Sequence, residues 1–281
     1  PMKNLSSIFI EYTNMITGGS HDDLLNLFRE TRLASYAIES CNAKKWWARL
    51  QSVRLIELVP DADREKILLR LLEDTHPIIR MSAVLASPLH PSEPVIEKMF
   101  ALFDREEIYE MHALKDTLVR LGPAVTGPMK RFLETRRVGE SLRVGLEVAG
   151  KLRDPILAAP ILEVMRGSKG DTQAEAARAL SAYPDDEIVN ELIAALDSED
   201  ERVRAMSAFS LGSIGFAGVT GKLEALLSDK AWIVRFHSAL AIKRMGAEGV
   251  KTLEKAAAGD DRYAADMAGY ILKLPEFALN L

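Results

Sequence analysis

The sequence predicts an all-α protein, an α-solenoid of about eight helical hairpins, and three observations support this prediction. Ile79-Arg80, Val203-Arg204 and Val234-Arg235 are separated by whole multiples of 31 residues, and a fixed period of this length is typical of stacked repeat units. Each unit contains two segments with the apolar periodicity of a helix, separated by turn residues. No segment shows the sustained alternation of a strand. Each unit is therefore expected to be a helical hairpin.

The 31-residue step runs through the chain without a gap and defines seven anchor positions. They are Arg49, Arg80, Met111, Leu142, Gln173, Arg204 and Arg235. Three residues after each anchor the residue is small in six of seven units, as helices require where they approach closely: Ser52, Ala83, Leu114, Gly145, Ala176, Ser207 and Ser238. Twenty-two residues after each anchor the residue is apolar, which predicts a core position: Leu71, Leu102, Leu133, Val164, Ala195, Leu226 and Ala257.

The ends of the chain depart from this register. Residues 1–45 are predicted to form an N-terminal helical cap, with an amphipathic helix from Asp22 to Ser40. Residues 46–281 are predicted to form the repeat solenoid, with a degenerate eighth unit around Tyr263. Pro275 is expected to end the last helix near Lys273, because the residue before a proline disfavours helical geometry.

Composition narrows the range of functions. A formal net charge of −5 disfavours a sequence-independent nucleic-acid binder, which needs clustered Lys and Arg. Cys41 is the only cysteine, so we expect no intramolecular disulfide and a reducing, cytoplasmic location. No apolar run reaches the length of a membrane span. Pro1 precedes Met2, which leaves open that the natural chain extends further and carries an N-terminal membrane anchor.

Two units of the last third share a residue pattern. The segments Glu199 to Gly212 and Asp229 to Ile242 each contain an acidic residue, then Val-Arg, then Ala. These segments resemble HEAT-like repeats of the phycobilisome-lyase type. The resemblance implies a right-handed solenoid of HEAT-like hairpins. Members of this class serve as scaffolds, adaptors, chromophore lyases, a hydroxylase of a modified lysine and a DNA glycosylase, so the resemblance indicates a fold and leaves the activity open.

The recurrent arginines are interpreted as structural. Arg80 and Arg235 follow Asp74 and Asp229 by six residues, and Arg204 stands at the same repeat position. A loop carboxylate could pair with the arginine and also cap the helix, giving a ladder of Asp-Arg pairs between successive hairpins. The alternative is a phosphate-binding role for these arginines.

No catalytic, cofactor-binding or metal-ligating residues are predicted. The five histidines show no metal-ligand spacing, and none is followed by the Glu that the HEAT-like di-iron hydroxylases use. Gly18-Gly19-Ser20 lacks the lysine of a phosphate-binding loop, and Cys41 lacks a neighbouring His or second Cys. No cofactor is therefore expected.

The anchor helices carry the candidate binding residues. If these helices line the concave face, as the resemblance implies, residues just before and after each anchor project into a groove. The predicted partner-binding residues are Trp232, Phe236, His237, Phe209, Met206, Tyr109, His112, Trp46 and Trp47. Aromatic residues often dominate binding energy at interfaces, although Trp46 and Phe236 could equally turn into the core.

The favoured function is a non-catalytic scaffold or adaptor that binds a protein or peptide in this groove. Three alternatives remain open. One is a bilin lyase or isomerase that acts on a chromophore-bearing protein, as the resemblance permits. Another is a DNA-base glycosylase, which the acidic balance disfavours. The last is a scaffold anchored to a membrane through sequence outside this chain.

Overall fold

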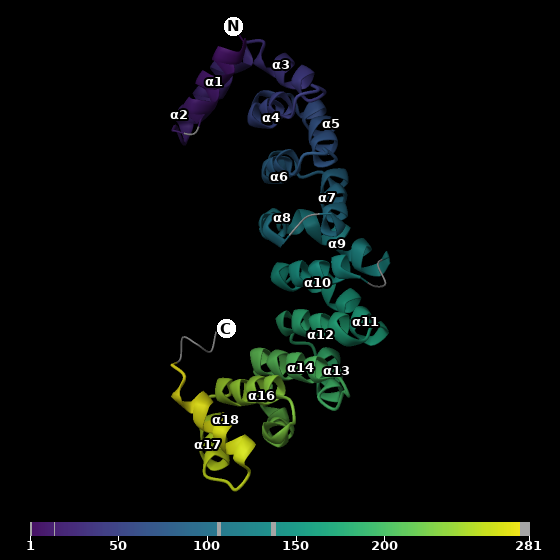
Figure 1. Cartoon of the computed structure of the whole chain (residues 1–281), viewed down its shortest axis with the longest axis vertical. Coiled ribbons are helices and arrows are strands. Elements are labelled where there is room, and N and C mark those ends of the chain that lie inside the picture. The colour runs from purple at the N-terminus through teal and green to yellow at the C-terminus, as the bar shows by residue number, and fades with distance from the viewer. Residues whose placement is uncertain (1, 14, 106–107, 136–138, 276–281) are drawn as a thin grey trace. The chain divides into compact units, whose positions relative to one another are not determined.

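The computed structural model describes residues 2–13, 15–105, 108–135 and 139–275, except for the side chains of Lys3 and residues 108–110. In these ranges the chain forms 18 α-helices and several short 3-10 turns, without a strand. The all-α prediction is confirmed. Contacts divide the chain into two compact units, Pro1–Pro128 and Met129–Leu281. Figure 1 labels the helices of each unit along the ribbon.

The first unit opens with three helices that precede the repeat register. They are α1 (Met2–Thr13), α2 (Gly19–Arg29) and α3 (Leu33–Ser40). The single helix predicted from Asp22 to Ser40 is wrong, because the chain turns at Thr31. The Thr31 hydroxyl donates to the carbonyl of Phe28 and accepts from the N–H of Leu33, which satisfies local backbone groups outside a helix. The assignment of residues 1–45 as a cap stays a prediction.

Alternating helices follow in the first unit. They are α4 (Trp46–Arg54), α5 (Asp61–Leu72), α6 (Pro77–Ala86), α7 (Glu93–Phe100), α8 (Ile108–Leu121) and the first residues of α9 (Pro123–Thr135). The anchor helices pack in sequence, α4 on α6 and α6 on α8, while α5 packs on α7. This arrangement gives two helix layers, which Figure 1 shows as two columns.

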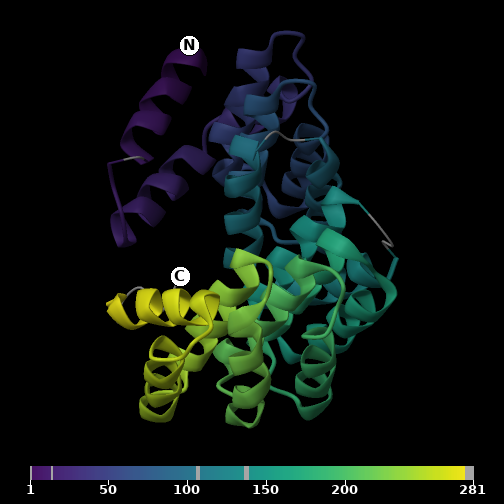
Figure 2. The ribbon, with the colours of Figure 1, turned by 60° about the horizontal axis from the view of Figure 1, so that its bottom comes forward.

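The second unit repeats the pattern. Its helices are α10 (Glu140–Leu152), α11 (Ala158–Gly167), α12 (Gly170–Ala179), α13 (Asp186–Ala195), α14 (Glu201–Ile214), α15 (Thr220–Ala225), α16 (Trp232–Arg244), α17 (Ala247–Ala257) and α18 (Arg262–Lys273). The anchor layer packs in the order α10, α12, α14, α16 and α18. In Figure 2 the yellow helices α17 and α18 lie beside the green α16 at the end of this unit.

Helix starts follow the 31-residue register. Six of the seven anchor helices begin three residues before the anchor, and α10 begins two before it. In the part of the chain that the structure describes, the units number seven hairpins followed by the lone helix α18. Seven hairpins, with α18 in place of the predicted degenerate eighth unit, agree with the prediction of about eight units within those residues. The end of the last helix at Lys273 is confirmed.

The two predicted columns differ in outcome. Every residue three positions after an anchor is buried, so the column that lets helices approach is confirmed. The column 22 positions after the anchor is buried at Leu71, Leu102 and Leu133, but only half-buried from Val164 onward. In those later units the next residue takes the core position: Met165, Leu196 and Leu227. The second helix there is turned so that its core stripe begins one residue later.

Candidate protein-binding surface

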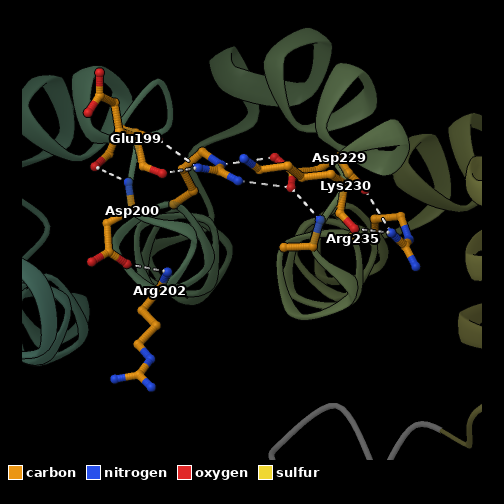
Figure 3. Close-up of polar contacts among 9 residues, drawn as sticks. Glu199, Asp200, Arg202, Asp229, Lys230 and Arg235 are labelled. Atoms are coloured by element: carbon orange, nitrogen blue, oxygen red, sulfur yellow. Dashed lines mark hydrogen bonds and ion pairs between the residues drawn. The ribbon is translucent and has the colours of Figure 1, made fainter.

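Arg204 and Asp229 form a buried two-bond ion pair between successive hairpins. The Nε and Nη2 atoms of Arg204 each donate to one carboxylate oxygen of Asp229, both at 2.9 Å. The Nη1 atom of Arg204 donates to the carbonyls of Ser198 and Glu199. Figure 3 shows these contacts beside the labelled Asp229. Each side chain is only 9% exposed, so the pair links α14 to the loop before α16.

The same geometry occurs in the first unit. Nε and Nη2 of Arg49 donate to the two oxygens of Asp74 at 2.5 and 2.8 Å, and Nη1 donates to the carbonyls of Ala43 and Lys44. Burial raises the pKa of Asp74, but hydrogen bonds from Arg49 and from the His76 N–H outweigh that effect and leave the pKa below its usual value. The Asp74 carboxylate is therefore held ionised.

The pairing differs from the sequence interpretation by one repeat. Asp74 and Asp229 bind the arginine 25 residues before them, while the arginine six residues after them, Arg80 or Arg235, donates through Nη1 to their main-chain carbonyl. Among the described residues, their carboxylates also accept no hydrogen bond from an N–H group inside the following helix. Asp229 accepts from the N–H of Ala231, the residue just before α16. The carboxylate thus shapes the loop that places the next hairpin.

An aromatic cluster lies on α14 and α16, which we call the C-terminal aromatic cluster: Trp232, Phe236, His237 and Phe209. Trp232 stacks on Phe236 with ring centroids 5.0 Å apart and an interplanar angle of 16°. His237 meets the edges of both Phe236 and Phe209. Trp232 is 54% exposed, whereas the other three are half-buried. The cluster therefore offers a flat apolar ring surface that is backed by packed side chains.

His237 keeps the centre of this cluster uncharged. Burial, followed by the positive charge of Arg244, lowers the pKa of His237 to about 4. Its Nδ1 atom is buried and has no hydrogen-bond partner among the described residues. The guanidinium of Arg244 lies 5.2 Å from the centre of the Phe209 ring, a cation-π distance.

Two hollows border the cluster. One, of 560 Å³, lies between α16 and α18 and is lined by Trp232, Arg235, Arg262, Tyr263, Asp266, Met267 and Tyr270. We call it the α16–α18 groove. The other, of 1100 Å³, lies at the C-terminal ends of α14 and α16 and includes Phe209, Lys243 and Arg244. The cluster thus separates an aromatic groove from a basic one.

Sequence reasoning missed Tyr263, Tyr270 and Arg262 as members of this surface. Tyr263 and Tyr270 are 61% and 51% exposed. A signal was present, because Tyr263 stands 31 residues after Trp232 and so occupies the same repeat position one unit later. The register predicted a degenerate unit there but did not assign it to the binding surface.

The remaining predicted residues lie elsewhere. Met206 is half-buried and packs against the core residues Ala205, Ala231 and Val234. In the first unit, Trp46 stacks on His76 at 4.6 Å, and Trp47 is 52% exposed with Lys45 over its ring. His112 is exposed on α8. The side chain of Tyr109 lies outside the described residues.

Within residues 2–13, 15–105, 108–135 and 139–275, no cluster of His, Cys, Asp and Glu side chains has the arrangement of a metal site. In the same ranges no helix combines the length and apolarity that crossing a membrane requires.

The paired hairpins and the repeated arginine-carboxylate links define a helical-repeat protein. The particular repeat is the HEAT repeat: the HEAT-repeat family model matches residues 158–243 and 189–270, so the chain contains HEAT repeats. Curated protein sequences gave no match.

Solved structures with a similar course of the chain include an engineered protein, with 15% identity, a TM-score of 0.44, and coverage of 97% of this chain and 95% of that one. The complex of CpcE and CpcF of phycocyanin lyase from Nostoc sp. PCC7120 has 16% identity, a TM-score of 0.38, and coverage of 85% and 93%. Human deoxyhypusine hydroxylase has 14% identity, a TM-score of 0.35, and coverage of 91% and 98%.

Proposed function

We propose that the chain is a non-catalytic binding scaffold, which holds a partner protein or peptide on the C-terminal aromatic cluster. The observation that supports this most directly is the stack of Trp232 on Phe236, with Trp232 54% exposed. A tryptophan held in a fixed orientation contributes a large contact area at small cost in conformational entropy, and tryptophan is enriched among the residues that dominate binding energy.

The surroundings suit an interface. The cluster sits on helices whose other faces are locked in the core, since Val234, Ala239 and Ser238 of α16 are fully buried. A partner would therefore meet a rigid surface, which reduces the ordering cost of binding. The buried free thiol of Cys41 fits a reducing compartment such as the cytoplasm.

A comparative affinity purification tests the proposal. The wild-type chain, the Trp232→Ala/Phe236→Ala variant and an Ile156→Ala control are each immobilised and exposed to lysate of the source cells. Ile156 is 54% exposed like Trp232 but lies on the turn before α11. We expect a protein that the wild type and the control retain and the double variant loses. Equal retention by all three chains, with unchanged circular dichroism, would place binding on another surface.

The enzymatic alternatives, a bilin lyase or isomerase and a DNA-base glycosylase, stay predictions. The first is separable from the scaffold by adding a free bilin to the purified chain and recording its absorbance spectrum.

A further inference from the structure

Arg235 is the last of the repeated arginines. The edge of its guanidinium that binds a carboxylate in Arg49 and Arg204 holds none of the described carboxylates here. Nη1 of Arg235 donates to the carbonyls of Asp229 and Lys230 at 2.7 and 3.1 Å, as Nη1 of Arg204 does to the two corresponding carbonyls. In Arg49 and Arg204 the other edge, Nε with Nη2, holds a carboxylate. In Arg235 that edge has no hydrogen bond to any residue that the structure describes.

The loop before α18 explains the open position. Asp74 and Asp229, the partners of Arg49 and Arg204, each stand three residues before the next anchor helix. Three residues before α18 stands Gly259, which has no side chain. Asp260, the residue 25 positions after Arg235, is exposed and has no hydrogen bond or ion pair with Arg235 in the part of the chain that the structure describes. The nearby Asp261 is engaged as the cap of α18, where it accepts from the N–H groups of Tyr263 and Ala264. A hydrogen bond from Ser228 and these caps, together with the charge of Arg235, lower the pKa of Asp261, but its carboxylate forms no hydrogen bond with Arg235 among the described residues.

The open edge of Arg235 belongs to the α16–α18 groove. The ring of Tyr263 lies 4.8 Å from the guanidinium carbon of Arg235, and Trp232 lies on the same groove. The groove also contains the cation of Arg262 and one carboxylate, Asp266, at 3.7 Å from Arg262. Its 560 Å³ falls within the range of about 300–1,000 Å³ usual for ligand pockets.

From this geometry we propose that the α16–α18 groove binds an acidic peptide segment of the partner, with an Asp or Glu carboxylate on Nε and Nη2 of Arg235 and an adjacent apolar side chain between Trp232, Tyr263 and Tyr270. The proposal rests on the protein-binding function proposed above and names the chemistry of the partner. The carboxylate completes the pair that Asp74 and Asp229 complete in other repeats. A planar guanidinium fork recognises a carboxylate through two parallel bonds, which a lysine cannot reproduce.

The test uses two probes on the whole chain: the acetylated, amidated peptide Gly-Leu-Phe-Asp-Gly-Ser and its counterpart with Asn in place of Asp. Binding is followed by the arginine Nε–Hε signals in nuclear magnetic resonance spectra, with the Arg235 signal assigned from its absence in Arg235→Lys. We expect the Asp peptide to shift that signal and to bind about tenfold more tightly than the Asn peptide. Arg235→Lys should lose the preference, whereas Arg202→Lys, a change at an exposed arginine of α14 outside this groove, should keep it.

A second variant tests the open position itself. Gly259→Asp places a carboxylate three residues before α18. A Cβ at 259 would meet the Ala256 carbonyl at 3.3 Å, a tight contact that a shift of a few tenths of an ångström relieves. The new side chain should occupy Arg235 and abolish the preference for the Asp peptide, while circular dichroism stays that of the wild type.

Several results would overturn the acidic-peptide proposal. They are an unmoved Arg235 signal, equal affinity for the two peptides, or a preference that survives both Arg235→Lys and Gly259→Asp. The Trp232→Ala/Phe236→Ala variant separates this failure from failure of the proposed function. If the two peptides bind the wild type equally and that variant binds neither, the aromatic surface binds partners but does not select carboxylates.

Discussion

Gly212 on α14 lies directly against Ala241 on α16. A Cβ atom built on Gly212 would stand 2.5 Å from the Cα atom of Ala241, closer than backbone and side-chain carbons approach in folded proteins. The absence of a side chain at 212 therefore sets the distance between these two anchor helices.

Gly212→Ala is expected to destabilise the second unit, because α14 and α16 must separate to admit the methyl group. Overpacking of this kind costs about 1–3 kcal/mol. Gly269→Ala on α18 is the control, since a Cβ there meets nothing within 4 Å and alanine favours a helix over glycine by up to about 1 kcal/mol. Urea unfolding should move the two midpoints in opposite directions. A Gly212→Ala variant as stable as the wild type would contradict the packing argument.

Asp229→Asn is expected to lower the free energy of unfolding by about 3–5 kcal/mol, because it leaves the buried Arg204 cation without a counter-charge. Asp197→Asn is the matched control: Asp197 pairs with Lys222 but is 73% exposed, and exposed pairs contribute about 1 kcal/mol or less. Urea titration at pH 7 compares the two losses. Similar small losses in both variants would show that the ladder contributes little.

The pair of Asp229 with Arg204 should also affect how the free energy of unfolding falls at acidic pH. Burial raises the pKa of Asp229. Hydrogen bonds from Arg204 and from the Ala231 N–H lower that pKa by more than burial raises it, so the folded pKa lies below that of the unfolded chain. The folded state then binds fewer protons, and the stabilisation is complete above the unfolded value of about 3.9 and lost as the pH falls through the folded value. Unfolding curves below pH 5 should fall less steeply for Asp229→Asn than for the wild type.

His237 adds a pH dependence at milder acidity. Its pKa is lowered from 6.5 to about 4, so the folded state resists protonation and stability declines as the pH falls from 6.5 towards 4. The decline is at most about 1.4 kcal/mol for each pH unit in this window. His237→Gln should remove that part of the decline. If the free energy of unfolding changes equally with pH in the wild type and the variant between pH 7.5 and 4.5, the pKa of His237 is not lowered by burial.

Lys243→Met is expected to loosen α18. The Nζ atom of Lys243 on α16 donates to the carbonyls of Ile271, Leu272 and Leu274 at 2.8, 3.3 and 2.6 Å. These carbonyls lie at the C-terminal end of α18, where a helix runs out of its own N–H donors; Ile271 also accepts from the N–H of Leu274. Hydrogen bonds to a charged donor contribute about 1.5–3 kcal/mol. Hydrogen exchange of residues 262–273 should quicken in this variant but not in Lys251→Met, whose ammonium pairs with the exposed Glu248.

Local patterns in the sequence were sufficient to predict the hairpins and their register. The column of small residues from Ser52 to Ser238 follows from the need of neighbouring helices to approach, and the structure buries every member. Spacing between neighbours along the chain could not reveal which arginine each aspartate binds. Asp229 is six residues from Arg235 but forms its pair with Arg204, 25 residues away, because one hairpin brings that side chain back.

The candidate binding surface was harder to predict from the sequence, because it too depends on contacts between residues far apart along the chain. Trp232 and Phe236 are four residues apart on one helix, so their proximity follows from helical geometry. Their contact with Phe209 through His237 depends on how α14 and α16 align. The open edge of Arg235 depends on where α18 begins, because that start decides which loop residue stands three positions before the helix.

In the second unit each anchor helix packs on the next, from α10 through α12, α14 and α16 to α18. Because each hairpin contacts only its neighbours, such a stack can unfold one hairpin at a time from its end. Force applied at its C-terminal end would detach α18 and α17 before the hairpins behind them, and each further 31-residue hairpin would release roughly 100 Å of extended chain. Because Trp232 lies at the start of α16, the aromatic cluster would lose the facing wall of its groove at the first such step while the earlier hairpins stayed folded.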